Sequence, residues 1–381
     1  MKTIKTDDFK VIGLDGGPGS GKTSGLSAVT NRTLDLGFVP IIVPESATLL
    51  IANGITPKNL GPVDFQKQIV KMQLQNESFY KKNAINIAKK LGKKPVLLCD
   101  RGILSGAAYL GDKTNLEDFQ KQILGSFNLS IEDIRVRYSG IIHMVTAANG
   151  AEEFYTTANN EARTESPELA RLIDEKTKEA WIGHPHLRVV PNRNQQNLQI
   201  NFEQKINHVI AEILGILGCP VPLEIEDKYV LRSFNEKDIP VKYESINISQ
   251  TYLLNKDPFV TERVRMRTYH HSSSYFHTIK IETNDNIGRI EIERPINEST
   301  YYRLLIRRDL HRNTILKKRY CFLWRDQYLE VDVFEGNNKG LKMLEREKTD
   351  RNDSTYLPDF LKIEKEVTNN PSYSNSMLAL M

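Results

Sequence analysis

The chain has 381 residues, of which 39% are hydrophobic and 26% charged, with a formal net charge of +4. This composition is that of a folded globular protein, and so small a net charge gives no sign of a nucleic-acid partner. Three cysteines without a C-x-x-C pair argue against a disulfide framework and a structural zinc site. At roughly 100–200 residues per domain, the length predicts two domains.

Residues 10 to about 218 alternate short apolar runs with helical patterns. A helix is expected to open at Gly21, and further helices are expected over 63–91, 167–181 and 202–217. The apolar runs predict buried strands at Lys10–Asp15, Phe38–Val43, Pro95–Asp100, Ile141–Thr146 and Leu187–Val190. Strands that alternate with helices indicate an α/β domain, with a parallel sheet covered by helices on both faces.

The rhythm changes after Gly218, where a Gly-Cys-Pro-Val-Pro stretch is typical of a domain boundary. From Leu223 onward most segments alternate with a period of 2, which favours mostly antiparallel strands. The expected domains are therefore residues 1–218 and 219–381.

The first strand is followed by a match to G-x-x-x-x-G-K-[ST], formed by Gly16, Gly17, Pro18, Gly19, Ser20, Gly21, Lys22 and Thr23. Strand, glycine-rich loop and helix together define a P-loop, whose backbone N–H groups surround phosphate oxygens. In this reading Lys22 contacts the β- and γ-phosphates of GTP or ATP, and the Thr23 hydroxyl binds Mg²⁺. The N-K-x-D motif of guanine-specific GTPases does not occur with the required spacing, so both bases stay open.

Acidic residues follow two of the predicted strands. Ligands of open α/β sheets bind outside the carboxyl ends of the strands, so Glu45 and Asp100 are expected to face the phosphates. Asp100 is a candidate Mg²⁺ ligand, and Glu45 a candidate general base or substrate-positioning group. Arg163 and Arg171 are candidates for lid arginines that neutralise phosphate, with salt bridges to nearby glutamates as the alternative.

These N-terminal motifs resemble those of known families. The strand–GGPGSGKT–helix unit, then VPE and CDRG, resembles P-loop kinase-like ATPases that include ribosylnicotinamide kinases, and the layout is similar to deoxynucleoside kinases. The stretch from Ile141 to Pro185 resembles the TRPL translocation defect protein 14 family of insects and its relatives. That resemblance implies GTP binding, phosphoinositide binding and a role in membrane-protein trafficking.

The second half contains like-charged pairs spaced at i and i+2. In a strand these two positions share a face, so each pair places two like charges on one side of a sheet. The alternative is an ordinary solvated face. In a closed barrel, basic rows can bind polyphosphate oxygens, and acidic rows can hold divalent cations. The pairs are Glu224 and Glu226, Arg265 and Arg267, Glu291 and Glu293, Lys317 and Arg319, Glu330 and Asp332, and Glu345 and Glu347.

Glu224-Ile225-Glu226-Asp227-Lys228, an E-x-E-x-K motif, and the later charged rows resemble the CYTH or triphosphate tunnel metalloenzyme family. The resemblance implies an antiparallel β-barrel tunnel that binds or hydrolyses triphosphates with Mg²⁺ or Mn²⁺. It implies metal-facing carboxylates at Glu224, Glu226, Glu345 and Glu347. It implies a phosphate-binding side at Lys228, Arg265, Arg267, Lys280, Lys317 and Arg319.

Two functions follow from these motifs. One is a nucleotide-dependent switch whose tunnel grips a phosphoinositide headgroup or another polyphosphate. The other is a bifunctional metal-dependent enzyme, a small-molecule kinase joined to a triphosphatase. The N-terminal MKTIKTDDFK lacks the apolar core of a signal peptide, and no apolar run approaches a membrane span. We therefore expect a cytoplasmic protein with peripheral membrane contact as an option and no nucleic-acid partner.

Overall fold

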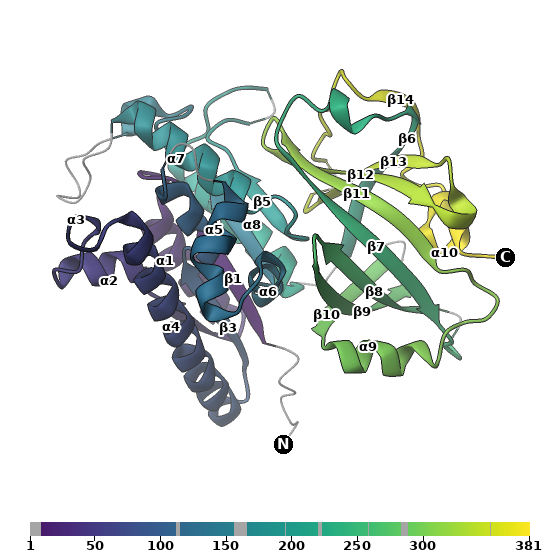
Figure 1. Ribbon diagram of the computed structural model, residues 1–381, viewed down its shortest axis with the longest axis horizontal. Coiled ribbons are helices and arrows are strands. Elements are labelled where there is room, and N and C mark those ends of the chain that lie inside the picture. The colour runs from purple at the N-terminus through teal and green to yellow at the C-terminus, as the bar shows by residue number, and fades with distance from the viewer. Residues whose placement is uncertain are drawn as a thin grey trace. The chain divides into compact units, whose positions relative to one another are not determined.

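The structure is a computed structural model. It describes residues 9–381 except 112–114, 156–165, 195, 220–222, 258, 283–288 and 351, and it describes Leu223, Glu224 and Arg289 by their backbone alone. The chain divides into two compact units, Met1–Ile216 and Leu217–Met381. Figure 1 shows an α/β unit and a β-rich unit, which are described separately below.

The first unit contains a parallel five-stranded sheet in the order β2-β3-β1-β4-β5. Central residues such as Ile12, Leu97 and Ile141 are fully buried, as expected where helices cover both faces of a sheet. The strands are β1 (Lys10–Asp15), β2 (Phe38–Val43), β3 (Lys94–Asp100), β4 (Gly140–Met144) and β5 (Leu187–Val190).

Helices connect these strands. The connection from β1 leads past β3 to the edge strand β2. The connections from β2 to β3, from β3 to β4 and from β4 to β5 all lead toward the opposite edge of the sheet. Right-handed connections therefore place α1 on one face and α4 and α7 on the opposite face. The α-helices are α1 (Lys22–Asp35), α2 (Ser46–Ala52), α3 (Pro57–Leu60), α4 (Pro62–Leu91), α5 (Leu116–Gln122), α6 (Ile131–Arg137), α7 (Pro167–Ala180) and α8 (Phe202–Leu217). Short 3-10 helices are η2 (Ile103–Tyr109), η3 (Leu124–Phe127) and η4 (Glu152–Phe154).

The second unit is an antiparallel barrel. Its nine-stranded sheet has the order β10-β9-β8-β7-β11-β12-β13-β6-β14, and a further pairing between β10 and β6 closes the ring, with β14 beside β6 as an added strand. The strands are β6 (Leu223–Ser233), β7 (Tyr243–Leu253), β8 (Val260–Tyr269), β9 (Ser272–Glu282), β10 (Arg289–Ile296), β11 (Ile315–Trp324), β12 (Gln327–Glu335), β13 (Lys342–Lys348) and β14 (Lys362–Glu366). The predicted fold class, an α/β P-loop unit followed by an antiparallel barrel, is confirmed.

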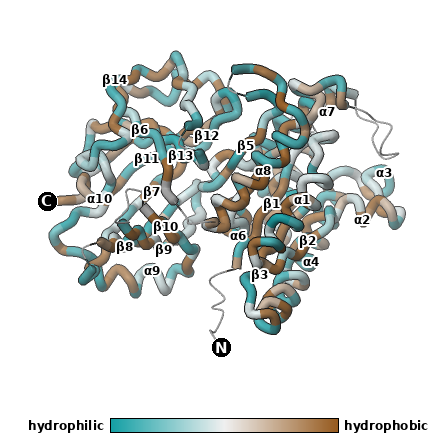
Figure 2. The backbone as a smooth tube through the Cα atoms, turned by 180° about the vertical axis from the view of Figure 1, so that it is seen from behind, coloured by the Kyte–Doolittle hydropathy of each residue, from teal (hydrophilic) through white to brown (hydrophobic). Residues whose placement is uncertain are grey.

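The outer face of the barrel carries the main apolar clusters of this unit. One cluster includes Phe322, Leu329 and Val331, and Leu361 packs on it from outside the ring. In a second cluster Tyr301, on helix α9 (Glu298–Leu305), packs against Leu253 and Val264. The alternate residues of the same strands are largely charged, and Figure 2 shows this mixture of hydrophobic and hydrophilic residues along the barrel. These alternate residues form the inner face.

An apolar layer lies beside the charged residues of the inner face. It contains Phe334 and Met343, which follow the inner-face alternation of β12 and β13, together with Val367 and Ala379 from the C-terminal segment. Ala379 directly follows helix α10 (Asn375–Leu378). The C-terminal segment therefore packs against the inside of the barrel next to the charged rows.

Three further 3-10 helices lie in this unit: η5 (Glu236–Asp238), η6 (Gly336–Asn338) and η7 (Pro371–Tyr373). Across the residues that the structure describes, none of the helices has both the length and the hydropathy to cross a bilayer.

Replacement of Phe322 by Ala is expected to lower the free energy of unfolding of the barrel unit by about 3–5 kcal/mol, because the ring is fully buried in the outer cluster. The measurement is urea unfolding followed by Trp324 fluorescence in a Trp181→Phe background, which leaves Trp324 as the one tryptophan. Leu316→Ala on the same strand, where the side chain is 41% exposed, is the control and should change stability by about 0.5 kcal/mol at most. Equal losses in the two variants would contradict the placement of Phe322 in a buried apolar cluster.

Candidate functional site

The phosphate loop, Gly16–Thr23, joins β1 to α1 through three glycines with positive φ. Gly16, Gly19 and Gly21 have φ of 143°, 74° and 88°, a region in which residues with a Cβ are strained. At Gly16 a Cβ would also lie 2.2 Å from the carbonyl oxygen of Met144. The glycines are therefore required by the course of the backbone, which turns its N–H groups toward one concavity.

Lys22 begins α1 and bends back over this loop. Its Nζ donates hydrogen bonds to the carbonyl oxygens of Gly16 (2.9 Å) and Gly17 (3.1 Å) and to Ser20 Oγ (3.2 Å). Burial, together with the charge of Arg101, lowers the pKa of Lys22 to about 8. Thr23 is exposed in the first turn of α1.

Asp100 ends β3, directly beside β1, because the register pairs it with Leu14. Burial raises the pKa of this carboxyl, with Lys22 acting in the opposite direction. Its Oδ1 is buried and has no hydrogen-bond partner among the residues that the structure describes. An exposed Thr23 and a carboxylate oxygen of this kind suit a hard cation such as Mg²⁺.

Glu45, which precedes α2, forms a close ion pair with Arg101 and accepts a hydrogen bond from Thr48 (2.7 Å). Burial opposes its ionisation, but the charges of Arg101 and Lys22 prevail and lower the pKa of Glu45 to about 2. A carboxylate so acidic is a weak base at neutral pH. The geometry therefore favours a positioning role over the general-base role.

Of the two candidate lid arginines, the structure describes Arg171 and not Arg163. Arg171 donates a hydrogen bond to the carbonyl oxygen of Ala148 (2.8 Å) and pairs with Glu168 (3.2 Å). It therefore adopts the salt-bridge alternative. Arg163 lies outside the described residues, and its predicted role stays a prediction.

Three further residues hold the loop and were missed by the sequence analysis. Asp15 accepts hydrogen bonds from the Gly16 N–H (2.9 Å) and from Trp181 Nε1 (2.7 Å). Lys205, a buried residue of α8, donates to the Ser20 carbonyl oxygen (3.2 Å). The position of Asp15 directly before the loop was a usable signal.

The third of these residues, Asp174 on α7, ties the loop to the end of β4. Its Oδ1 accepts from the backbone N–H groups of Gly17 (2.7 Å) and Thr146 (3.1 Å), and His143 Nε2 lies 3.2 Å away. Burial opposes ionisation, but His143 and these hydrogen bonds lower the pKa of Asp174. No local pattern marks this residue, since its contact with Gly17 spans 157 positions of the chain.

The second site is the inner face of the barrel, where the strand register brings the charged rows together. Lys228 lies opposite Glu345, Glu330 opposite Glu345, and Arg319 opposite Asp332. On the other side Lys280 lies opposite Glu291, and the Arg289–Glu224 pairing closes the ring. The like-charged i, i+2 pairs whose side chains the structure describes therefore share this one face.

Arg319 is the centre of the acidic side. Its guanidinium binds Asp332 through Nε and NH2 (2.7 Å each), Glu345 through NH2 (2.7 Å), and Glu330 closely through NH1. Lys317 also contacts Asp332, and Lys228 pairs with Glu226 (2.7 Å) and lies 3.6 Å from Glu345. Arg319 therefore compensates buried carboxylates, a role that the sequence analysis did not assign to it.

The basic side centres on β8. Arg263 pairs with Glu291 (3.1 Å) and Arg265 with Glu293 (3.5 Å), and Lys280 contacts Glu291 (3.2 Å). Burial and the neighbouring charge of Arg263 lower the pKa of Arg265, whose Nε has no hydrogen-bond partner in the described part of the chain.

Arg267, on the same face as these two arginines, is 3% exposed. Arg263 was missed by the sequence analysis, although it extends the predicted pair to an R-x-R-x-R run. The three arginines form one row, in which Arg263 and Arg267 are buried and Arg265 is partly buried.

The structure describes the side chains of only some of the carboxylates that were predicted to face a metal ion. Glu226 and Glu347 lie directly opposite each other on β6 and β13. Lys228 already pairs with Glu226 (2.7 Å), and opposed carboxylates of this kind can also bind a divalent cation through their oxygens. The side chain of Glu224 lies outside the described residues. Within the described residues no group of three Asp, Glu, His or Cys side chains is close enough to hold a metal ion.

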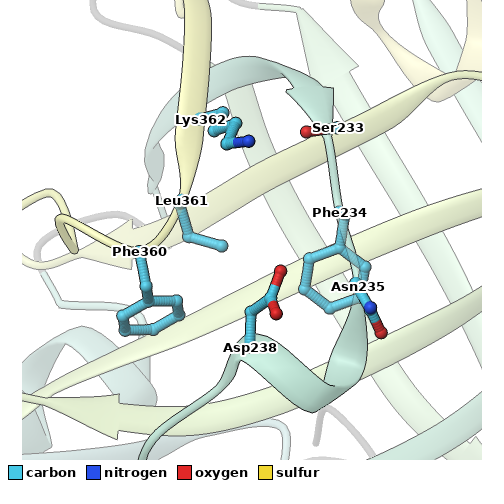
Figure 3. Close-up of a pocket in the computed structure, with 7 residues that line it drawn as sticks. All are labelled: Ser233, Phe234, Asn235, Asp238, Phe360, Leu361 and Lys362. Atoms are coloured by element: carbon cyan, nitrogen blue, oxygen red, sulfur yellow. The ribbon is translucent and has the colours of Figure 1, made fainter.

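A small pocket lies elsewhere on the barrel unit. Figure 3 shows its lining residues, Ser233, Phe234, Asn235, Asp238, Phe360, Leu361 and Lys362. Phe234, Phe360 and Leu361 belong to the outer apolar cluster. The pocket is therefore separate from the charged inner face, and we assign it no role in either site.

Comparison with known proteins agrees with both units. A family model described as an AAA domain matches residues 11–196. An inorganic triphosphatase of Acetivibrio thermocellus is 31% identical over 158 residues, which are 41% of this chain and 92% of that protein. The chain thus joins an AAA-type P-loop unit to a triphosphatase-like barrel. It belongs to the family of this inorganic triphosphatase.

Solved structures were also compared. The crystal structure of an inorganic triphosphatase has 25% identity and a TM-score of 0.31, with 42% of this chain and 95% of that chain covered. A Pyrococcus horikoshii protein has 21% identity and a TM-score of 0.25, with 32% and 77% covered. The name of the TRPL translocation defect protein 14 family is not among these findings, so that resemblance stays a prediction.

Replacement of Asp174 by Ala is expected to lower the free energy of unfolding of the first unit by about 3 kcal/mol, because two buried backbone N–H groups lose their acceptor. Asp174→Asn keeps an amide oxygen at this position and should recover most of the loss. The measurement is urea unfolding followed by Trp181 fluorescence in a Trp324→Phe background. A loss in Asp174→Asn as large as that in Asp174→Ala would show that charge, and not hydrogen bonding, is what matters.

Lys205 gives a pH dependence of known sign. Burial lowers its pKa in the folded unit to about 8 from an ordinary value of 10.5, so between these values the unfolded chain binds more protons. The contribution of Lys205 to the free energy of unfolding therefore rises with pH across this window. When the pH is raised from about 7.5 to about 9.5, the urea midpoint of the parent chain should therefore rise relative to the midpoint of Lys205→Met, which lacks this group. Identical pH profiles of the two proteins would contradict the shifted pKa.

Proposed function

We propose that the barrel unit is a divalent-metal-dependent triphosphatase and that the P-loop unit binds a nucleoside triphosphate, GTP or ATP. The observation that carries the first proposal is the inner face, where a row of three arginines and rows of carboxylates, among them the buried Asp332 and Glu345, line a closed ring. The family membership supports the same activity, because the matched relative is an inorganic triphosphatase.

The basic row supplies the phosphate-binding half of this site. Arg265 lies beside Arg263, and burial together with that neighbouring charge lowers the pKa of Arg265. A bound triphosphate would add negative charge beside this row, and guanidinium groups can contact phosphate oxygens in a forked geometry. Lys280 and Lys317, on β9 and β11, would contact further oxygens of the chain.

The acidic row supplies the metal-binding half. Glu226 and Glu347, with Glu224 two positions before Glu226 on β6, would hold Mg²⁺ or Mn²⁺. Such an ion, when bound, polarises a phosphoryl oxygen and neutralises the developing charge. Arg319 holds Glu330, Asp332 and Glu345 in place and so fixes the wall of the site. Hydrolysis would add water across a terminal phosphoanhydride bond and release phosphate and diphosphate.

The P-loop unit has a second candidate activity. Asp100 with its buried Oδ1, the Glu45–Arg101 pair and Lys22 lie together, and this arrangement favours phosphoryl transfer from the nucleotide to a small acceptor. Nucleotide consumption that increases when an acceptor is added, and that is lost in Lys22→Met, would support it.

A polyphosphorylated inositol headgroup is the other ligand class for the barrel. Its phosphates offer the same oxygens to the basic row as a triphosphate does. Phosphoinositide binding and a trafficking role rest on the sequence resemblance alone. Inhibition of triphosphate hydrolysis by inositol polyphosphates at concentrations at which free phosphate has no effect would support this alternative.

Two adjacent lysines of β11 provide the test. Lys317 lies on the inner face, whereas Lys318 lies on the outer face beside Glu236. Lys317→Met is expected to reduce kcat/KM for inorganic triphosphate by about 100-fold or more, the usual cost of losing one charged contact to the transition state. Lys318→Met should stay within about twofold. Phosphate release is measured with Mg²⁺ or Mn²⁺ and again after chelation.

Lys22→Met separates the two units in this assay and should leave triphosphate hydrolysis unchanged. Circular dichroism of all variants verifies folding. Equal effects of Lys317→Met and Lys318→Met, or hydrolysis that depends on Lys22, would place the activity outside the barrel.

A further inference from the structure

An exposed aromatic ring lies against the phosphate loop. Phe202 is the first residue of α8, and a Cβ built on Gly21 would lie 2.6 Å from its Cε2 and 3.1 Å from its Cζ. The edge of the ring therefore rests on the loop backbone. Half of the residue nevertheless remains accessible to solvent, at 50% relative exposure.

Hydrogen bonds hold the start of α8, which carries this ring, against the phosphate loop. Lys205, one turn further along α8, donates hydrogen bonds to the carbonyl oxygens of Ser20 (3.2 Å) and Val145 (2.6 Å) and to Asn192 Oδ1 (2.7 Å). Asn192 in turn donates to the carbonyl oxygens at the end of β4. The start of α8 is thus joined by buried hydrogen bonds to the loop itself.

The N-terminus of α8 is also closed locally. Asn201 Oδ1 accepts from the Gln204 N–H, and Gln204 Oε1 accepts from the Asn201 N–H, both at 2.9 Å. This reciprocal pair fixes the entry of the chain into the helix directly before Phe202. An aromatic side chain on so constrained a backbone can present a face to a ligand with little loss of conformational entropy.

The strand order decides which end of a nucleotide faces Phe202. Asp100, Glu45 and Arg101 follow β3 and β2, on one side of β1, and together with Lys22 they surround the reacting end of the triphosphate. Phe202 follows β5, on the other side of β1. A triphosphate that lies across the end of β1 with its γ-phosphate toward Asp100 therefore directs its nucleoside toward β4, β5 and Phe202.

We propose that Phe202 is the stacking surface for the base of the nucleoside triphosphate. This inference rests on the proposed nucleotide binding by the phosphate loop and adds the base subsite to it. Stacking of a base on an aromatic side chain strengthens binding and accepts either purine, because every base has a π-face. Phe202 thus supplies affinity for the nucleoside without choosing between ATP and GTP.

The experiment separates stacking on the base from support of the loop. A fluorescent N-methylanthraniloyl nucleotide is bound to the protein, and the part of its signal that disappears in Lys22→Met is taken as binding at the phosphate loop. Unlabelled ATP, GTP or inorganic triphosphate is then added to displace the fluorescent nucleotide from the loop. In Phe202→Leu the inhibition constants of ATP and GTP should rise about tenfold. That of inorganic triphosphate, which has no base, should stay within twofold.

Two variants control this comparison. Phe202→Tyr keeps the aromatic face and should bind both nucleotides as the parent does. Phe79→Leu removes a ring that is 62% exposed on α4 and should change nothing. An equal rise for inorganic triphosphate and nucleotides, or no rise at all, would overturn the base subsite alone. Fluorescent binding that is unaffected by Lys22→Met would overturn nucleotide binding by the loop as well.

Discussion

The pairing of opposite charges inside a closed ring is the interaction on which the barrel depends. Buried ions are costly unless they are paired, and Arg319 meets this requirement by binding three carboxylates at once. On the β8 side three arginines and Lys280 lie beside Glu291 and Glu293, and burial together with the charge of Arg263 lowers the pKa of Arg265. The interior thus combines a compensated wall, which holds the structure, with a cationic wall that is suited to an added polyanion.

The P-loop unit meets a related requirement with backbone groups. Its loop needs glycines to turn inward, and such a loop needs supports that keep it in shape. Asp15, Asp174 and Lys205 provide these supports from β1, α7 and α8, through hydrogen bonds to the loop backbone. These three supports come from outside the phosphate loop, whereas Lys22, the proposed phosphate-contacting residue, belongs to the loop itself.

Local sequence predicted most of the fold because periodicity, glycines and strand-end acids are local signals. The P-loop, the α/β alternation and the charged i, i+2 pairs of the barrel all depend on neighbours a few residues apart. Asp174 and Lys205 could not be found in this way, since their partners are 157 and 185 positions away. The role of Arg319 was also out of reach, because one of its three partners, Glu345, lies on β13, 26 positions further along the chain. Arg263 was within reach, as the third member of an alternating run.

The apolar layer beside the charged rows has a consequence for how the barrel handles a long ligand. Phe334 and Met343, packed with Val367 and Ala379, fill the interior on one side of those rows with apolar side chains. A polyanion finds no charged partner in this layer. Under the proposed triphosphatase activity, the layer would therefore favour ligands whose phosphate chain ends at the charged rows.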